Sequence, residues 1–311
     1  MEKYLVGIDI GGTSVKIGVF DLERTLVKTF DMPTNTKENG KYILRDIYNE
    51  ISNNLDINQV LGYGFGVPGA CKDDIVYGCV NLGWGTVNVK EEFNKFFNKE
   101  TIVKVGNDAN VAALGEVLYG AAKGAMNACF ITLGTGVGGG IIIDGKIREG
   151  MFGAAGEVGH MHLDFDYNFE CNCGGVGCLE TVASATGIVN VANEFLKEYH
   201  GDSVLKDVPH LSAKKVIDAA KDNDDLALKI MDKVTSYLGH LCSVLTTTLN
   251  PEVIIFGGGV SNAGEFLRAK IEEKFKAIST PMILTSIKIA TLKNDAGIYG
   301  AMGLINEEIN F

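Results

Sequence analysis

The sequence predicts an α/β protein of two domains with a duplicated architecture. The chain has 311 residues, 46% of them hydrophobic and 22% charged, which is globular composition with enough length for two cores. Residues 4–20 and 128–143 repeat one pattern, in which a turn of glycine and threonine separates two apolar stretches. Such a pattern is typical of two strands joined by a tight turn. The repeat indicates that both domains open in the same way.

In the N-terminal half, strands at 4–10 and 15–20 flank the turn Gly11-Gly12-Thr13. A mainly apolar strand at 102–105 runs through Gly106-Asn107-Asp108 into a helix with clear periodicity at 110–119. We place the domain boundary at the end of this helix. The expected domains are therefore 1–118, joined by a C-terminal helix at 296–311, and a larger domain at 119–295.

The C-terminal half begins with strands at 128–133 and 140–143 around Gly134-Thr135-Gly136. A buried strand at 253–256 is followed by three glycines and then by Ser261, which we expect to cap a helix through residue 275. The remaining expectations are a polar loop at 200–206, a helix at 226–249 that stops at Asn250-Pro251, and a last helix at 296–309 capped by Asp295.

Charge and hydropathy exclude several classes of protein. The formal net charge is −11, whereas a nucleic-acid binder usually carries a basic face, so no nucleic-acid partner is expected. No apolar run is long enough to span a membrane, and residues 1–8 contain no signal-peptide core. We expect a cytoplasmic protein with no membrane partner.

Three of the seven cysteines form a cluster, whereas Cys129 lies in an apolar run and is expected to be a buried thiol. One histidine and three cysteines are a common closed set of zinc ligands, and glycines between them permit the tight turns needed. The predicted ligands are His160, Cys171, Cys173 and Cys178. Four protein ligands leave no open position, so the zinc would be structural. His162, between two apolar residues, fits an alternating strand position better than a ligand.

The glycine turns could bind phosphate. Gly134-x-Gly136-x-x-Gly139 matches a dinucleotide fingerprint in form, but a strand follows it where that fingerprint needs a helix, and the chain has no Walker A sequence. A turn that exposes backbone N–H groups can hold an anion, although such a turn is often only a turn. Asp9, just before the first turn, makes sense if Mg²⁺ accompanies the phosphates. Residues 257–259 serve either close helix–strand packing or the approach of a flat base.

Asp108 is the candidate for chemistry. It follows a strand and precedes a helix, where an aspartate can cap the helix or can accept a proton from a substrate hydroxyl. Phosphoryl transfer needs little beyond such a base, a metal ion and positioned phosphates.

These motifs together resemble the ROK family, named for repressors, open reading frames and kinases, over essentially the whole chain. The motifs are Asp9-x-Gly11-Gly12-Thr13, Asn107-Asp108, Leu133-Gly134-Thr135-Gly136-x-Gly138-Gly139-Gly140, Glu157-x-Gly159-His160 and Cys171-x-Cys173-Gly174-x-x-Gly177-Cys178-x-Glu180. The resemblance implies an actin/hexokinase-like ATPase fold, a ribonuclease H-like duplication of two α/β domains around a central cleft.

The resemblance also implies roles by position. Asp108 would be the base, and Asp9 would serve Mg²⁺. The ATP-binding residues would be Gly11, Gly12, Thr13, Thr135, Gly136, Gly257, Gly258 and Gly259. The sugar-binding residues would be Gly69, Asn81, Asn107, Asp108, Glu157, His160 and Glu180. His160 could bind zinc through one ring nitrogen and face the sugar through the other.

Within the family, residues 81–84 and 178–184 are most similar to the bacterial glucokinase branch. The implied reaction is ATP-dependent phosphorylation of glucose at its 6-hydroxyl, with dimers common among relatives. Alternative substrates are N-acetylmannosamine, N-acetylglucosamine, fructose and β-glucosides. A sugar-sensing repressor is a further alternative, disfavoured because no DNA-binding segment is expected before Asp9. Gly106 departs from the family pattern, in which an acidic residue is frequent before Asn-Asp.

Overall fold

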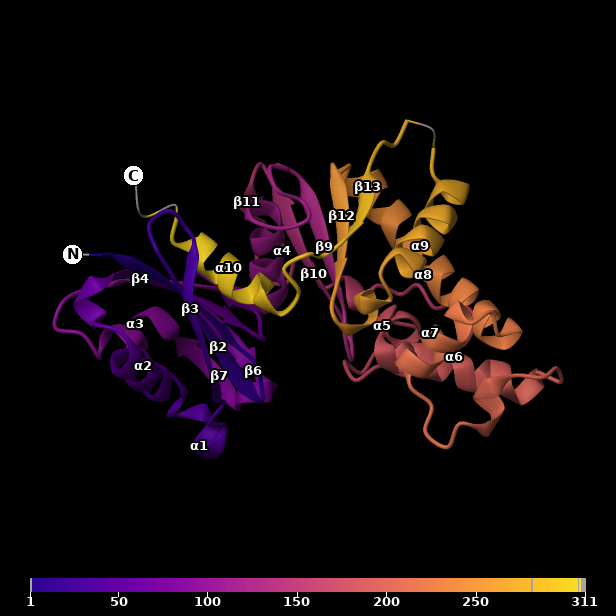
Figure 1. The fold of residues 1–311 in the computed structure, drawn as a ribbon, viewed down its shortest axis with the longest axis horizontal. Coiled ribbons are helices and arrows are strands. Elements are labelled where there is room, and N and C mark those ends of the chain that lie inside the picture. Colours follow the sequence, from indigo (N-terminus) through magenta and orange to yellow (C-terminus); the bar gives the residue numbers. More distant parts are fainter. Residues whose placement is uncertain (1, 281, 307, 309–311) are drawn as a thin grey trace. The chain divides into compact units, whose positions relative to one another are not determined.

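The structure is a computed structural model that describes residues 2–280, 282–306 and 308 (Figure 1). The chain divides into two compact units. Unit 1 contains the residues up to Gly124, Gly140–Gly156 and the residues from Leu292 on, and unit 2 contains Ala125–Gly139 and Glu157–Thr291. The domain bounds 1–118 with 296–311, and 119–295, stay a prediction.

The sheet of unit 1 has the strand order β3-β2-β1-β4-β8. β1 (Tyr4–Ile10) pairs antiparallel with β2 (Ser14–Phe20), and β2 pairs antiparallel with β3 (Leu26–Pro33). On the other side of β1, β4 (Val60–Val67) and β8 (Ile102–Asn107) add in parallel. The strands predicted at 4–10, 15–20 and 102–105 are confirmed.

Two layers of helices cover this sheet. On one face, α10 (Ala296–Leu304) packs against β1, β4 and α4 (Asp108–Leu118), and Figure 1 shows α10 beside these strands. An added Cβ at Gly7 would lie 2.0 Å from the Ile298 carbonyl oxygen, so β1 and α10 touch through their backbones. The core of the other face includes Ile8 and residues of α2 (Ile43–Asn54) and α3 (Val89–Asn94). Strand alternation therefore places Asp9, like Gly7, on the α10 face.

The remaining elements of unit 1 lie in connections. The described elements are α1 (Lys37–Gly40), η1 (Ile57–Gln59), β5 (Cys71–Lys72), β6 (Ile75–Cys79), η2 (Val80–Leu82) and β7 (Trp84–Asn88). Strands β5, β6 and β7 form a small antiparallel sheet. Trp84 is buried and its indole N–H donates to the Gly40 carbonyl at 3.0 Å, so it is a core residue.

The second sheet has the order β11-β10-β9-β12-β13. Its strands are β9 (Ala128–Leu133), β10 (Val137–Ile143), β11 (Lys146–Ile147), β12 (Val253–Gly257) and β13 (Ser286–Ile289). β12 runs parallel to both β9 and β13. When the strands of each sheet are counted along the chain, both sheets have the order 3-2-1-4-5. The duplication predicted from the repeated turns is confirmed.

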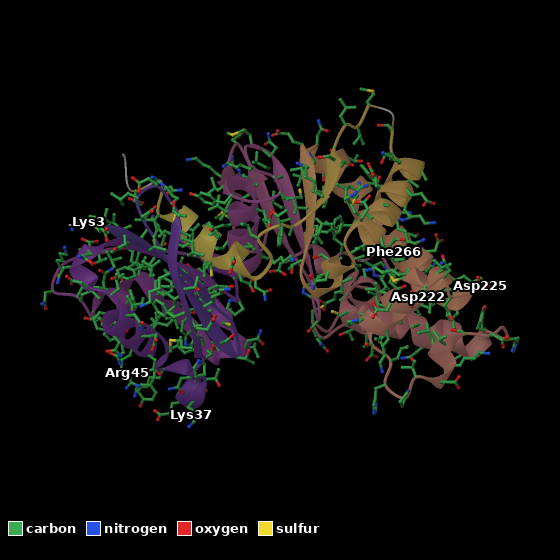
Figure 2. All side chains as sticks on the ribbon, viewed as in Figure 1. Lys3, Lys37, Arg45, Asp222, Asp225 and Phe266 are labelled. Carbon is green, nitrogen blue, oxygen red and sulfur yellow. The ribbon has the colours of Figure 1, made fainter. Side chains whose placement is uncertain are left out.

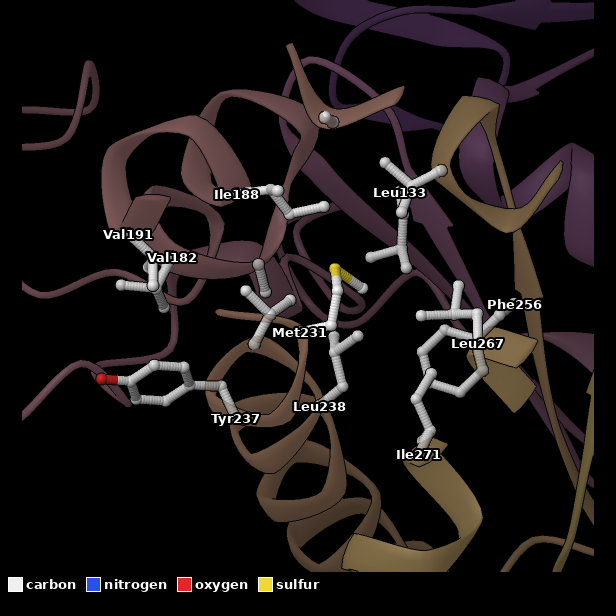
Figure 3. Close-up of a cluster of buried hydrophobic side chains, with 14 of the residues drawn as sticks. Leu133, Val182, Ile188, Val191, Met231, Tyr237, Leu238, Phe256, Leu267 and Ile271 are labelled. Carbon is white, nitrogen blue, oxygen red and sulfur yellow. The ribbon is translucent and has the colours of Figure 1, made fainter. Parts of the chain in front are cut away.

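The helices of unit 2 enclose one apolar core. They are α5 (Glu180–Ala183), α6 (Ala185–Glu198), α7 (Ala213–Lys221), α8 (Asp225–Leu249) and α9 (Glu265–Ile278), with short 3₁₀ turns η3 (Val158–His160), η4 (Val204–Asp207) and η5 (Gly259–Ala263). Figure 3 shows Leu133 of β9 and Phe256 of β12 facing Met231 and Leu238 of α8 and Ile271 of α9. The helix predicted at 226–249 is confirmed, and it ends where Asn250 adopts the left-handed conformation.

Most charged side chains lie outside these cores, with Glu116 and Asp164 as fully buried exceptions. Figure 2 shows Lys37 and Arg45 projecting from unit 1, and Asp222 at the end of α7 and Asp225 at the start of α8 projecting from unit 2. The guanidinium of Arg45 stacks on Tyr42, 4.4 Å from the ring centroid. No helix among the described residues has the length and apolar character needed to cross a bilayer.

Neither Ser261 nor Asp295 caps a helix through its side chain. Ser261 does not cap a helix, because it lies inside η5 and donates its hydroxyl to the Gly258 carbonyl at 2.7 Å. Gly264, at φ 68° and ψ −135°, then breaks the chain direction before α9 begins. Asp295 does occupy the N-cap position of α10, as predicted, but its side chain makes no capping hydrogen bond, and its carboxylate pairs with Lys16 at 2.5 Å.

Three further elements differ from the prediction. Helix α10 ends at Leu304, and residues 307 and 309 of the predicted helix lie outside the described residues. The loop expected at 200–206 contains the beginning of η4. Strand β10 begins at Val137, three residues earlier than predicted, because its glycines are extended and buried or half-buried.

Candidate functional site

The two acidic candidates of unit 1 emerge at one edge of its sheet. Parallel pairing aligns Asp9 with Gly66 and Gly66 with Gly106 across β1, β4 and β8. Asp108 follows β8 directly, and the carboxyl ends of parallel strands are where α/β sheets usually bind ligands. The side chains of Asp9 and Asp108 therefore share this edge.

Helix α10 packs closely against the side chain of Asp9. An added Cβ at Gly297 of α10 would lie 2.3 Å from the Asp9 carboxylate, so only glycine fits there. Burial, reinforced by the negative charge of Asp108, raises the pKa of Asp9 from 3.8 to about 6, and Lys16 opposes this effect. A pair of partly buried carboxylates gains from a cation, and hard oxygen ligands suit Mg²⁺.

The cost of burying the Asp9 carboxylate should lower the stability of the ligand-free protein at high pH. Above pH 6 Asp9 is charged in the unfolded chain and in the folded protein, so folding must bury a charged carboxylate, and a pKa raised from 3.8 to about 6 corresponds to about 3 kcal/mol. This penalty is absent below about pH 4 and grows as the pH rises through 6. We expect Asp9→Asn to raise the melting temperature of metal-free protein by several degrees at pH 8 but not at pH 4. Equal melting temperatures of variant and wild type at both pH values would contradict the raised pKa.

Asp108 is the first residue of α4 and does not provide its cap. Asn107, at φ −63° and ψ 142°, is the cap, and its side-chain oxygen accepts the N–H groups of Ala109 at 3.0 Å and Asn110 at 3.2 Å. The reading of Asp108 as the N-cap is therefore wrong. Its half-buried carboxylate also accepts the Ala109 N–H at 2.8 Å, which fixes its orientation at the helix start.

Other candidates in unit 1 meet in pairs. The Asn107 side chain donates to the Gly69 carbonyl at 3.1 Å, and an added Cβ at Gly69 would lie 2.6 Å from the Gly78 carbonyl oxygen. Exposed Asn81 lies on η2, and its Cβ would be 3.5 Å from a Cβ added at Gly12. Thus the first glycine turn adjoins Asn81, and Gly69 adjoins Asn107.

The first glycine turn is tightly closed. Gly11 N–H donates to the Ser14 carbonyl at 2.9 Å, and the Thr34 hydroxyl donates to the Gly11 carbonyl at 2.6 Å. Thr13, at the tip, is exposed. A rigid turn with an exposed threonine matches the expected phosphate contact.

The glycine segments of unit 2 also converge. In the second turn, Gly134 N–H donates to the Gly136 carbonyl at 3.0 Å, and Thr135 is exposed. Gly258 has φ +80°, and a Cβ added there would lie 2.6 Å from the Leu133 carbonyl oxygen at the base of this turn. Residues 257–259 therefore lie beside the turn of 134–136.

The predicted zinc ligands are together. One ligand atom from each of His160, Cys171, Cys173 and Cys178 lies within 4.8 Å of the others. The sulfurs of Cys173 and Cys178 are 3.7 Å apart, and two Zn–S bonds of about 2.3 Å in a tetrahedron require about 3.8 Å. The Gly175 N–H, donated to Cys173, lowers the pKa of that thiol, which favours the thiolate that zinc needs. The donor set and its spacing fit zinc.

His162 lies outside this ligand set. It forms a bridge opposite Cys178, and its Nδ1 lies 2.8 Å from the Val176 carbonyl oxygen. In contrast, His160 turns Nδ1 toward Cys171 at 3.7 Å. The ring nitrogen Nε2 of His160 is then the one left for another partner, as the dual role requires.

Glu180 connects the ligand cluster to the second glycine turn. One oxygen accepts the Cys171 thiol at 2.9 Å, and the other lies 3.4 Å from the Val137 N–H. An added Cβ at Gly136 would lie 2.5 Å from the second oxygen. Gly136 is thus required for the approach of Glu180, a reason for this glycine that the sequence did not reveal.

Gly136→Ala should therefore act through Glu180. The added methyl must displace the carboxylate, and we expect kcat/KM for the sugar to fall about tenfold, since a misplaced contact of this kind costs one or two kcal/mol. Gly134→Ala is the matched control, because nothing lies within 4 Å of its added Cβ. If both alanine variants had the same kcat/KM, the close approach of Glu180 to residue 136 would not matter for activity.

Some supporting residues were not found from the sequence. Lys16 lies opposite Asp9 in the β1–β2 register, and Gly297 backs Asp9 from α10. The run of small residues in α10 was a usable signal for close packing. Gly106 also has a packing reason, since an added Cβ would lie 2.9 Å from Val111.

Comparison with known proteins identifies the relatives of this chain. The family model described as the ROK family matches residues 5–308. The chain is 39% identical to a glucokinase of Halalkalibacterium halodurans, over 99% of this chain and 97% of that protein, and 34% identical to one of Thermotoga maritima, over 98% of each. Its fold is similar to the crystal structure of a ROK family glucokinase from Streptomyces griseus in complex with glucose and AMPPNP. The TM-score is 0.76 and the identity is 30%, over 98% of this chain and 99% of that one.

Proposed function

Because this chain belongs to the ROK family of sugar kinases and has their hexokinase-like fold, we propose that it transfers the terminal phosphoryl group of ATP to the 6-hydroxyl of glucose. The observation that carries the proposal is the placement of Asp108 beside Asp9 at the carboxyl edge of the sheet. A base and a cation-binding carboxylate at one edge are what phosphoryl transfer requires. The glucokinases among its relatives support glucose as the substrate.

In the proposed reaction, Asp108 accepts the proton of the 6-hydroxyl. The sugar oxygen forms a bond to the terminal phosphorus, the anhydride bond to ADP breaks, and ADP leaves with the electron pair of that bond. Because the Asp108 carboxylate is anchored at the first turn of α4, it can take the proton without reorganising the backbone.

The glycine segments would bind ATP. We assign its phosphates to Gly11, Gly12, Thr13, Thr135 and Gly136, and its nucleoside to residues 257–259. The close approach of Gly258 to the base of the second turn supports this assignment. Asp9 would hold Mg²⁺ through water, and the ion, when bound, would neutralise phosphate charge. Lys16, paired with Asp295 across from Asp9, fixes the surroundings of that carboxylate.

Polar side chains would recognise the sugar hydroxyls. We assign this role to Gly69, Asn81, Asn107, Glu157, His160 and Glu180. Several fixed donors and acceptors give specificity, because a sugar without the matching hydroxyl leaves a buried group unpaired. Zinc bound by the three cysteines and Nδ1 of His160 would be structural, and it would hold His160 directly and Glu180 through Cys178, two residues before it. We also propose a homodimer, which light scattering tests.

The proposal is tested by incubating the chain with ATP, Mg²⁺ and glucose and identifying the product by NMR. The expected product is glucose phosphorylated on the 6-oxygen, with one ADP formed per sugar. Formation of ADP without a phosphorylated sugar, or phosphate on another oxygen, would refute it.

A further inference from the structure

Glu116 in α4 is a fully buried acidic residue with a role not yet accounted for. Its exposed fraction is 0%, and its carboxylate accepts the Ala121 N–H at 2.7 Å and the Leu292 N–H at 2.8 Å. All three residues belong to unit 1. Burying a carboxylate is costly unless donors converge on it, so such a residue generally holds a specific arrangement.

The loop after α4 is shaped around this carboxylate. The backbone N–H groups of Gly120 and Ala122 donate to the Glu116 carbonyl at 3.1 and 3.0 Å. A Cβ added at Gly120 would lie 2.1 Å from the Glu116 carboxylate, so a larger residue would displace it. The position of the carboxylate is therefore fixed from the α4 side.

The chain comes into contact with Asp9 only a few residues after Leu292. The 3₁₀ turn η6 (Lys293–Asp295) follows Leu292 and leads directly into α10. Asp295 pairs with Lys16, which lies opposite Asp9 in the strand register. Gly297, in the first turn of α10, contacts the Asp9 carboxylate. The segment held by Glu116 is thus the one that forms the wall behind Asp9.

Helices α4 and α10 are locked together by their backbones. A Cβ added at Gly115 would lie 2.4 Å from the Ala296 carbonyl oxygen, and one added at Gly300 would lie 1.7 Å from that of Val111. Helix α4 begins with Asp108, and α10 backs Asp9. Glu116, next to Gly115, therefore fixes the start of α10 against the helix that carries Asp108.

We propose that Glu116 is a positioning residue for the divalent cation that accompanies the nucleotide phosphates. By holding the Leu292 N–H it sets the first turn of α10, and through Gly297 it sets the orientation of the Asp9 carboxylate relative to Asp108. This inference rests on the proposed kinase function. It assigns to Glu116 an effect on cation binding that a residue with a purely structural role would not have.

The test uses Glu116→Gln, which keeps the size of the side chain but turns one acceptor into an N–H donor facing a backbone N–H. Mg²⁺ is titrated into full-length protein saturated with ADP and followed by its thermal stabilisation. We expect the Mg²⁺ concentration at half effect to rise about tenfold, the change in affinity that about 1.4 kcal/mol corresponds to. The same rise is expected in turnover, with the KM for glucose changed less than about twofold.

Glu252→Gln is a control for the loss of a carboxylate–amide contact, at an exposed position. The Glu252 carboxylate also accepts two backbone N–H groups, those of Met126 and Asn127, each at 2.9 Å, but all three residues lie in unit 2. This variant should lower the melting temperature and leave the Mg²⁺ dependence unchanged. The comparison separates loss of a carboxylate–amide contact in general from loss of this one.

Gly120→Ala is a second variant, which displaces the Glu116 carboxylate without removing it and serves if Glu116→Gln does not fold. Should the folded variants of Glu116 and Gly120 both keep the wild-type Mg²⁺ dependence, the proposal is overturned. Absence of turnover by the wild type with any hexose would refute the kinase function instead. The Mg²⁺ titration in ADP reports on Glu116 without turnover, so the two failures are distinguishable.

Discussion

Asp108→Asn should nearly abolish turnover and keep sugar binding. Asparagine is isosteric but cannot take a proton, and a positioned general base contributes about 10² to 10⁴ in rate. We expect kcat to fall at least about a thousandfold, while the dissociation constant for glucose, measured by calorimetry, changes less than about threefold. The fold should persist, because Asn107 and not Asp108 caps α4.

A second readout accompanies this variant. The charge of Asp108 is one of the causes that raise the pKa of Asp9, so the pKa of Asp9 should fall in Asp108→Asn. Asp222→Asn is a suitable control, because this exposed residue lies in unit 2 and should leave kcat unchanged. Turnover by Asp108→Asn near the wild-type rate would rule out Asp108 as the base.

Cys173→Ser should remove the metal and with it most of the activity. Structural zinc sites contribute about 10 kcal/mol or more to the folding of the segment that they close, and serine is a poor zinc ligand. We expect bound zinc to fall from about one ion per chain to almost none, and kcat/KM to fall about a hundredfold or more. The physical reason is that the candidate ligands hold the site residues in place, because His160 is itself one of these ligands and Glu180 follows Cys178 by two residues.

The zinc content and the activity of the Cys173→Ser protein are measured on the same sample. Cys129→Ala is the control, since Cys129 is buried in β9 and burial raises its pKa to about 12, well away from thiolate chemistry. That variant should retain its zinc. Full activity of Cys173→Ser protein from which zinc is absent would refute a zinc-braced sugar site.

The architecture was predictable because its signals are local. The repeated glycine turns mark β1–β2 and β9–β10, and apolar runs mark β8 and β12. Helix ends were predicted less well, since Ser261 and Asp295 have the side chains of caps but use them for other contacts. A sequence pattern does not tell where a side chain finds its best partner.

In the candidate site, too, residues in local motifs were predictable and contacts between distant segments were not. The four candidate zinc ligands lie in short motifs and were predicted from their spacing, whereas the role of Asn107 followed only from the family resemblance. The contacts of Gly297 with Asp9 and of Gly136 with Glu180 join residues far apart in the chain. They depend on how helices and strands pack, and a single sequence carries no direct record of that packing.

The proposed activity of this chain is that of a hexose kinase of the glucokinase type. The most direct measurement is kcat/KM of the wild-type protein with ATP and Mg²⁺ for glucose, compared with N-acetylmannosamine, N-acetylglucosamine, fructose and a β-glucoside in the same assay. We predict that glucose has the highest value, by at least about tenfold, because polar groups matched to its hydroxyls exclude its analogues. A higher value for N-acetylmannosamine would contradict the glucokinase assignment, and no turnover of any of these sugars would contradict the whole account.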